Sequence, residues 1–144
     1  MSRHNVTDAK NGMGDGMSEF QSIDTSRQCI TISRELKMTP QPARRGPEPR
    51  ADGLTVGIVE MSRDAPHDGE MHPDGDEFVC VLAGSVSVTI DSMPESITLR
   101  AGEACLIPRG EWHRVHLLEP TRLLHITPGP RGEHRPVRAS DPLR

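Results

Sequence analysis

Between residues 54 and 128 the sequence is a succession of short apolar runs, each ended by a turn that contains glycine or proline. The run Ser85–Ile90 alternates polar and apolar residues, which is the period-two pattern of a half-buried strand. No stretch shows the spacing of an amphipathic helix. Strands this short and this closely spaced favour an antiparallel sandwich or barrel. The expected strands are Leu54–Met61, Phe78–Leu82, Ser85–Ile90, Ser96–Leu99, Ala104–Ile107, His113–Leu118 and Arg122–Thr127.

Composition changes along the chain divide it into four parts. Residues 1–27 are rich in polar residues and glycine, and are predicted to be a disordered N-terminal tail. Residues 28–53 hold one β-rich run followed by a segment with four prolines, which predicts a strand and a proline-rich linker. Residues 54–128 form the predicted barrel. Residues 129–144, which follow a Pro-Gly-Pro sequence, are predicted to be a C-terminal tail.

Charge and cysteine content exclude several classes of function. The net charge is −4 at pH 7, so the chain lacks the basic surface of a nucleic-acid-binding protein. No apolar run is long enough to cross a membrane or to act as a signal peptide, and this predicts a cytoplasmic protein without a membrane partner. The three cysteines form no CxxC pair, which argues against both a disulfide framework and a zinc ribbon.

Two segments bring metal-ligating residue types to one side of the predicted barrel. Glu70 and His72 are two residues apart and share a strand face, and the turn 73–76 carries the chain back so that Glu77 lies across from them. On a later strand His113 faces the same interior. Carboxylate oxygens and imidazole nitrogens suit a first-row divalent ion, and buried carboxylates rarely lack a cationic partner. We therefore predict one divalent metal bound by Glu70, His72, Glu77 and His113.

The spacing within both segments resembles that of the cupin family. Glu77 is followed after six residues by Gly84, as in the first cupin motif. The run from Gly102 through Pro108 and Gly110 to His113 has the spacing of the second motif. The resemblance covers about residues 54–128. It implies an all-β antiparallel jelly-roll barrel, a metal near the barrel centre and frequent homodimers.

The sequence departs from the family pattern at two positions. Glu70 occupies the place of the first histidine of the first motif, and Leu117 occupies that of the usual asparagine after the second. If Glu70 binds, two carboxylates favour a harder ion such as Mn or Fe(II) over copper. If Glu70 turns away, His72, Glu77 and His113 form a two-histidine, one-carboxylate set with open positions. The metal is expected to be Fe, Mn, Ni or Zn.

Other residues near the two motifs are also candidates for the site or its surroundings. Glu70 is interpreted as a ligand, a catalytic base or an outward surface residue, and the sequence does not decide between these roles. His67 is predicted to lie in a solvated loop, His134 in the tail and His116 on the surface. The predicted pocket wall consists of Val79, Val81, Val88, Val115, Leu117 and His125.

The function expected from this pattern is that of a metal-dependent cupin acting on a small oxygenated metabolite. The resemblance implies that a dioxygenase or an isomerase is the first hypothesis, with the ion polarising a substrate oxygen or binding dioxygen. The alternative is a non-catalytic small-molecule-binding or sensor protein. A further alternative is a barrel that binds no metal and works through dimerisation. A small-molecule ligand and a second copy of the chain are the expected partners.

Overall fold

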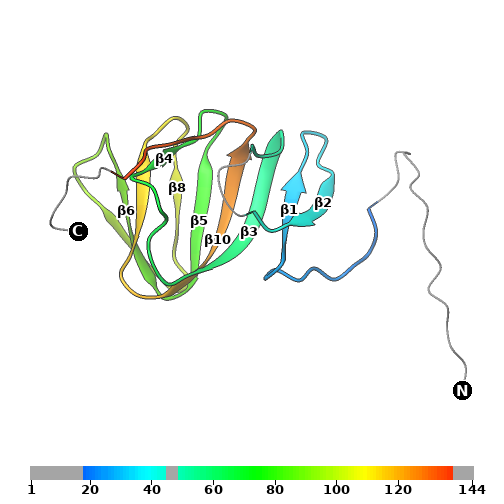
Figure 1. The fold of residues 1–144 in the computed structure, drawn as a ribbon, viewed down its shortest axis with the longest axis horizontal. Coiled ribbons are helices and arrows are strands. Elements are labelled where there is room, and N and C mark those ends of the chain that lie inside the picture. The colour runs from blue at the N-terminus through cyan, green and yellow to red at the C-terminus, as the bar shows by residue number, and fades with distance from the viewer. Residues whose placement is uncertain (1–17, 45–48, 138–144) are drawn as a thin grey trace, which may run out of the picture.

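The computed structural model describes residues 18–44 and 49–137, and shows two antiparallel β-sheets packed face to face (Figure 1). Within these residues there is no helix, and hence none that could span a membrane. The prediction of an all-β antiparallel jelly roll is confirmed. The six-stranded sheet has the order β2 (Met38–Pro42), β1 (Gln28–Ile32), β3 (Gly53–Met61), β10 (Thr121–Gly129), β5 (Glu77–Ala83) and β8 (Ala104–Ile107). The five-stranded sheet has the order β11 (Glu133–His134), β4 (Glu70–Met71), β9 (His113–Leu117), β6 (Ser85–Ile90) and β7 (Ile97–Arg100).

The core lies between the two sheets and is built from alternate residues of their strands. On β5, Val79 and Val81 are buried, whereas Phe78 and Cys80 are only half-buried, because successive side chains of a strand point to opposite faces. Burying one such aliphatic side chain contributes about 1.5–3 kcal/mol. Aromatic residues are absent from this cluster, which consists of Val79, Val81, Val86, Val88, Leu99, Ile107 and Leu123.

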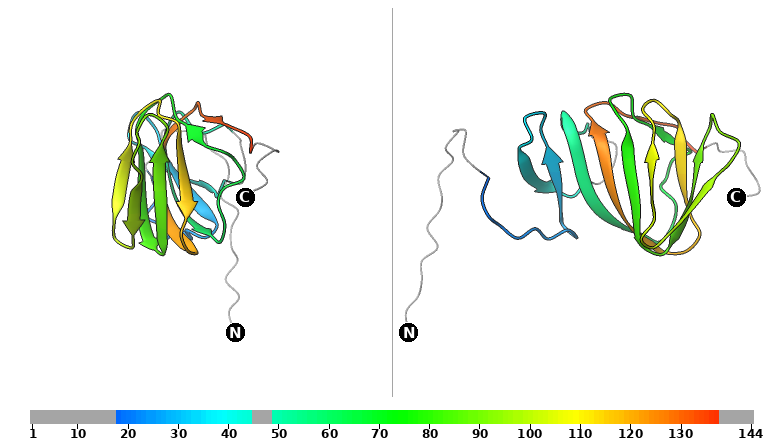
Figure 2. Two further views of the ribbon diagram at one scale, coloured as in Figure 1. Left: turned by 90° about the vertical axis from the view of Figure 1, so that its left-hand side faces the viewer. Right: turned by 180° about the vertical axis from the view of Figure 1, so that it is seen from behind.

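Strand β10 is the centre of the larger sheet and carries side chains into the space between the layers. It pairs with β3 from Thr121 to Gly129 and with β5 on its other edge. The two layers are seen edge-on in the left view of Figure 2. In Figure 1, β1 and β2 lie beyond β3, on the side away from β6, so they extend the larger sheet past the smaller one.

Part of the predicted proline-rich linker is a strand, which corrects the sequence prediction. Met38–Pro42 forms β2 and pairs with β1, with Pro40 opposite Ile30 and Pro42 opposite Gln28. Proline lacks the N–H donor that an interior strand needs, and for that reason the pattern predicted a loop. An edge strand tolerates proline because only one of its sides is paired, and β2 is the edge of its sheet.

The predicted C-terminal tail also contains ordered structure. Gly129 is the last residue of β10, and Glu133–His134 forms β11, which pairs with β4. Backbone hydrogen bonds of 2.7 Å from Asp68 N to Arg135 O and of 2.9 Å from Arg135 N to Gly69 O extend this pairing. A strand of two residues has no periodicity that the sequence could reveal. The predicted disorder of residues 1–17 and 138–144 lies outside the described residues.

Candidate metal centre

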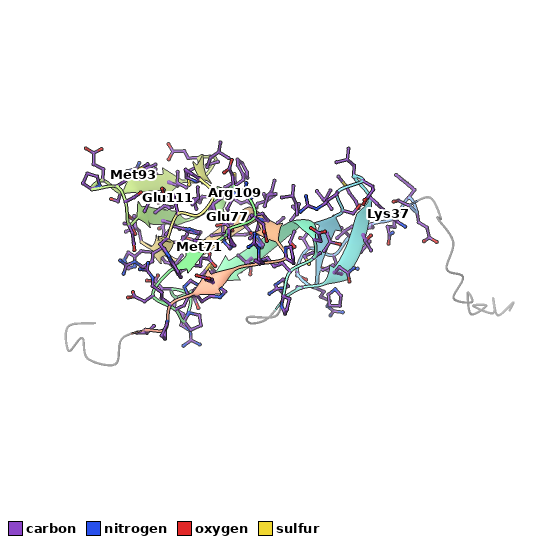
Figure 3. All side chains as sticks on the ribbon, turned by 90° about the horizontal axis from the view of Figure 1, so that it is seen from above. Lys37, Met71, Glu77, Met93, Arg109 and Glu111 are labelled. Atoms are coloured by element: carbon purple, nitrogen blue, oxygen red, sulfur yellow. The ribbon has the colours of Figure 1, made fainter. Side chains whose placement is uncertain are left out.

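Neighbouring strands place the four predicted ligands on the inner face of the barrel. Glu70 in β4 is directly opposite His113 at the start of β9, so their side chains leave the sheet on the same side. His72 follows β4, and Glu77 is the first residue of β5 in the facing sheet. Figure 3 shows Glu77 in the interior of the molecule, while Met93 lies at its outer end. The four predicted ligands therefore come from both sides of the sandwich and point into the space between the two sheets.

The four side chains converge on a common point. His113 Nε2 lies 3.1 Å from Glu77 Oε1 and 3.5 Å from Glu70 Oε1. His72 Nε2 lies 3.2 Å from Glu77 Oε2, and the two imidazole rings are 5.5 Å apart between centroids. One ligand atom from each residue lies within 4.8 Å of those from the others, and three of the four residues are buried. A single ion with bonds of about 2.0–2.2 Å fits between atoms at this spacing.

The state of the two histidines favours a metal over a simple ion-pair network. His72 is 4% exposed; its Nδ1 has no partner among the described residues, and its Nε2 faces Glu77 Oε2 at 3.2 Å without the angle of a hydrogen bond. Buried polar atoms without a partner are costly, and a metal ion at Nε2 would remove that cost. His113 Nδ1 lies 3.0 Å from the carbonyl oxygen of Glu111, so Nδ1–H donates there and Nε2 faces the centre, where loss of its proton would free a lone pair for a metal. The residues therefore fit a divalent ion.

Without a metal, the buried charges hold one another in their ionised forms. Burial alone lowers the pKa of His113, but the carboxylates of Glu70 and Glu77 raise it to about 10. Burial likewise raises the pKa of Glu77, yet its hydrogen bond with His113 and the nearby His72 hold that pKa well below its usual range. The pKa of Glu70 is also lowered, because the effect of His113 outweighs that of burial. A proton on His113 thus occupies the place that a cation would take.

The sequence did not identify Thr127, which connects the ligands to a further histidine. Thr127 is fully buried, and its hydroxyl donates a hydrogen bond of 2.6 Å to Glu77 Oε2. Because the hydroxyl proton is used in that bond, Thr127 Oγ1 acts as the acceptor of the 2.8 Å hydrogen bond from His125 Nδ1–H. A Cβ at Gly57 would lie 2.6 Å from His125 Nε2, so this glycine makes room for the ring. The only pattern that could have revealed Thr127 is its position two residues after His125, on the same strand face.

Replacing Thr127 by valine tests this support of Glu77. The valine keeps the shape but removes the hydrogen bond that orients the carboxylate. We expect metal affinity to fall about 10–100-fold, the usual effect of losing a partner of a metal ligand. Titration with Mn(II) measures the affinity, and the exposed Thr98→Val on β7 is the control. An unchanged affinity would mean that Thr127 does not orient Glu77.

The two carboxylate oxygens of Glu70 point to different groups of histidines. Oε1 points to His113 and His72, as described above. Oε2 lies 3.2 Å from His134 Nε2 and 3.8 Å from His67 Nε2. The interpretation of Glu70 as an outward surface residue is therefore wrong. His67 was predicted to lie in a solvated loop and His134 in the tail; the structure places both beside Glu70, with His67 21% and His134 39% exposed. His116 is on the surface, where it contacts Asp64.

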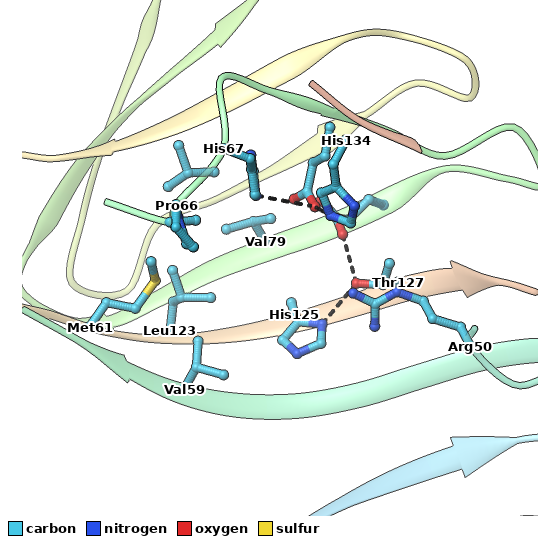
Figure 4. A pocket seen from close by; sticks show the side chains of 14 residues that line it. Arg50, Val59, Met61, Pro66, His67, Val79, Leu123, His125, Thr127 and His134 are labelled. Atoms are coloured by element: carbon cyan, nitrogen blue, oxygen red, sulfur yellow. Dashed lines mark hydrogen bonds and ion pairs between the residues drawn. The ribbon is translucent and has the colours of Figure 1, made fainter. Parts of the chain in front are cut away.

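A cavity of about 470 Å³ adjoins the cluster and is lined by two of its four residues, Glu70 and Glu77 (Figure 4). Val79, Val115 and His125 line it, together with His67 and His134. Val81, Val88 and Leu117 do not line it, which corrects their prediction as pocket wall. Val81 and Val88 belong to the packed core, and Leu117 packs against that core. Strand parity predicts which side chains face inward, but it does not show how far along each strand the space between the sheets is filled.

Comparisons with known proteins gave one family match and several similar solved structures. Residues 58–127 match the family described as cupin domain. A cupin-2 domain containing protein from Shewanella frigidimarina superposes with a TM-score of 0.47 and 24% identity, over 60% of this chain and 84% of that one. A protein from Bacillus halodurans gives 0.48 and 26% identity, over 59% and 71%. Oxalate decarboxylase from Bacillus subtilis gives 0.49 and 19% identity, over 56% and 23%.

Superpositions at this level say nothing of substrate or reaction. A comparison with curated proteins gave no significant match. The matched region begins within β3 and ends within β10, and it contains all four converging side chains. The region 58–127 therefore matches a cupin domain, and the fold of its two sheets agrees with that match.

Proposed function

We propose that this protein is a metal-dependent enzyme that acts on a small oxygenated metabolite. Glu70, His72, Glu77 and His113 hold one divalent ion at the inner end of the cavity. The observation that carries the proposal is the convergence of these donors around His72, a buried imidazole without a hydrogen-bond partner among the described residues. The cavity beside them has the size of an ordinary small-molecule site.

The donor set selects among metals. Two carboxylates and two imidazoles bring two formal negative charges, which a divalent ion cancels. Hard oxygen donors favour Mn(II) and Fe(II), whereas the absence of a thiolate from the four residues removes the main preference for copper(I). Thr127 and Glu111 hold Glu77 and His113 in place, so the ligands are oriented before the ion arrives.

The ion would supply a Lewis acid that polarises a substrate oxygen. The chain supplies the rest of the site. Val79, Val115 and Leu123 form an apolar wall that limits water around the substrate. Glu70 lies at the boundary of ion and cavity, where its Oε2 accepts a hydrogen bond from His134 Nε2 and lies 3.8 Å from His67 Nε2. A carboxylate at this point is placed either to complete the ligand set or to take a proton from carbon next to a carbonyl.

Both proposed reaction classes, dioxygenase and isomerase, use a metal beside an oxygenated substrate. They differ in whether oxygen is consumed. The first experiment is metal analysis of protein purified without chelators, in which we expect about one divalent ion per chain. A screen of small keto and hydroxy acids follows, with oxygen consumption recorded by electrode. Metal-free protein with an intact fold would overturn the proposal, while stoichiometric metal with binding but no turnover would favour a sensor or binding protein.

The role of Glu70 is tested by Glu70→Gln. Oε1 lies 3.5 Å from His113 Nε2, within the ligand cluster, so we expect the substitution to weaken Mn(II) binding about 10–100-fold. Calorimetric titration measures the affinity. Glu60→Gln, which removes an exposed carboxylate on β3, is the control and leaves the affinity unchanged. Full metal affinity with a turnover reduced by about 10²–10⁴ would instead identify Glu70 as a base.

A further inference from the structure

The cavity beside the proposed metal centre contains an arginine that has no part in the proposed metal site. Arg50 lines the cavity together with Glu77, Thr127 and His125. Figure 4 shows the side chain of Arg50 next to Thr127. Its Nη1 is buried and has no hydrogen-bond partner among the described residues. A buried guanidinium donor without an acceptor costs free energy, so its retention requires another explanation.

The backbone holds Arg50 closely at this position. A Cβ at Gly129 would lie 2.7 Å from Arg50 Cβ and 2.4 Å from the carbonyl oxygen of Ala51. The segment that carries Arg50 therefore lies directly on the end of β10, and only a glycine there permits this approach. Arg50 is consequently placed by packing, although its Nη1 is left without an acceptor.

The formal charges of the cavity indicate what Arg50 meets. The lining includes two carboxylates, Glu70 and Glu77, and both attract Arg50. Neither lies within 4 Å of the guanidinium, so no ion pair forms in the described part of the chain. A divalent ion cancels both carboxylates. Arg50 then remains as the uncompensated formal charge among the described lining residues, and one monoanion neutralises it.

We propose that the cavity takes a small monocarboxylate, with its carboxylate on Arg50 and an oxygen of its neighbouring carbon toward the metal centre. This inference rests on the proposed function and adds the substrate class. The planar guanidinium binds a carboxylate through parallel N–H donors, which lysine or a neutral donor cannot reproduce. The apolar surfaces of Val59, Met61 and Leu123 line the same cavity and leave room for a short hydrocarbon chain.

The test uses the full chain loaded with Mn(II) and two probes of nearly equal size, pyruvate and its neutral analogue pyruvamide. We expect pyruvate to bind at least about tenfold more tightly than pyruvamide. Arg50→Gln should weaken pyruvate binding about 10–100-fold, the range of a charge-assisted hydrogen bond, and leave pyruvamide unaffected. Arg50→Lys should recover only part of the loss. The control is Arg100→Gln on β7, which changes the net charge equally, lies outside the cavity lining and should alter binding by less than about twofold.

The possible outcomes distinguish a failure of this inference from a failure of the proposed function. Mn(II) bound at full occupancy, with pyruvate binding unaffected by Arg50→Gln or matched by pyruvamide, would overturn the inference and leave the proposed function standing. Tighter, Arg50-dependent binding of inorganic phosphate would overturn the carboxylate class. If no Mn(II) binds, the proposed function fails, and this inference fails with it because an anion would face two bare carboxylates.

A stability measurement separates a binding role from a structural one. Burial and, after it, the positive charge of Arg44 together lower the pKa of Arg50 more than the two carboxylates raise it, which means that the folded protein disfavours its charge. Arg50→Met retains an apolar side chain along the wall and removes that charge. We expect the melting temperature of the metal-free protein to rise by about 2–5 °C. A clear fall would show that Arg50 supports the fold and would overturn the inference.

Discussion

Alanine in place of His113 is expected to abolish metal binding by this protein. His113 is fully buried, its Nε2 faces two carboxylates, and its tautomer is set by the carbonyl oxygen of Glu111. Removal of this ligand leaves one imidazole and the carboxylates, so we expect an affinity at least about 100-fold lower. Metal content after gel filtration and titration with Mn(II) both measure the loss.

The same substitution should destabilise the metal-free protein. It leaves Glu77 buried with a weaker set of partners, and breaking a buried ion pair costs about 3–5 kcal/mol. The gain in melting temperature on adding Mn(II) is therefore the better measure, because it compares each variant with its own metal-free form. A ligand that binds only the folded state stabilises it by about 2.7 kcal/mol at 100 times Kd. Wild-type protein should show the gain and the variant should not. His116→Ala, on the exposed face of the same strand, should behave as wild type. Equal metal occupancy in both variants would rule out His113 as a ligand.

Metal affinity should rise steeply with pH. In the metal-free protein the pKa of His113 is raised to about 10, so a proton must leave this imidazole before Nε2 can bind an ion. Below that pKa, affinity should increase about tenfold per pH unit, and therefore about 100-fold between pH 6 and pH 8. Competition with a chelator of known pH dependence measures this slope. Proton release recorded with a weakly buffered dye should be about one per ion.

The stability of the metal-free protein should depend on pH in the opposite direction. His113 has a folded pKa above its usual 6.5, so the stability it contributes is complete below pH 6.5 and is lost as the pH rises toward 10. Glu77 has a lowered pKa, so its contribution is present above pH 4.5 and is lost on acidification. Denaturant unfolding of chelator-treated protein should therefore give its highest stability between about pH 4.5 and pH 6.5. Stability that is flat from pH 6 to pH 9, together with no proton release, would contradict the ion pair.

The positions of the four converging residues could be predicted because each depends on local rules. Strand parity places Glu70 with His72 and His113 with Val115, and the turn after His72 returns Glu77 to the same interior. These rules act over a few residues. His134 could not be placed in this way, because its position depends on a two-residue strand that forms only against β4.

The features that escaped prediction depend on packing between distant segments. Arg50 follows a proline-rich stretch with no apolar pattern, and only its contact with Gly129 brings it to the cavity. Thr127 reads as an ordinary strand residue until Glu77 lies beside it. Val81 and Val88 have the correct parity for a pocket wall, but the sheets approach closely at their level and fill the space. Parity gives the face of a strand, whereas the depth of a cavity follows from how two sheets diverge.

The prolines of β2 limit how copies of this protein can join. Pro40 and Pro42 occupy alternate positions of the edge strand, and proline in a paired strand keeps its nitrogen on the unpaired side. A strand arriving from another molecule would find no donor at these two points, so this border resists sheet-to-sheet polymerisation. The opposite border of the larger sheet, β8, contains no proline, and its Leu106 is 69% exposed, so this border is the more open of the two.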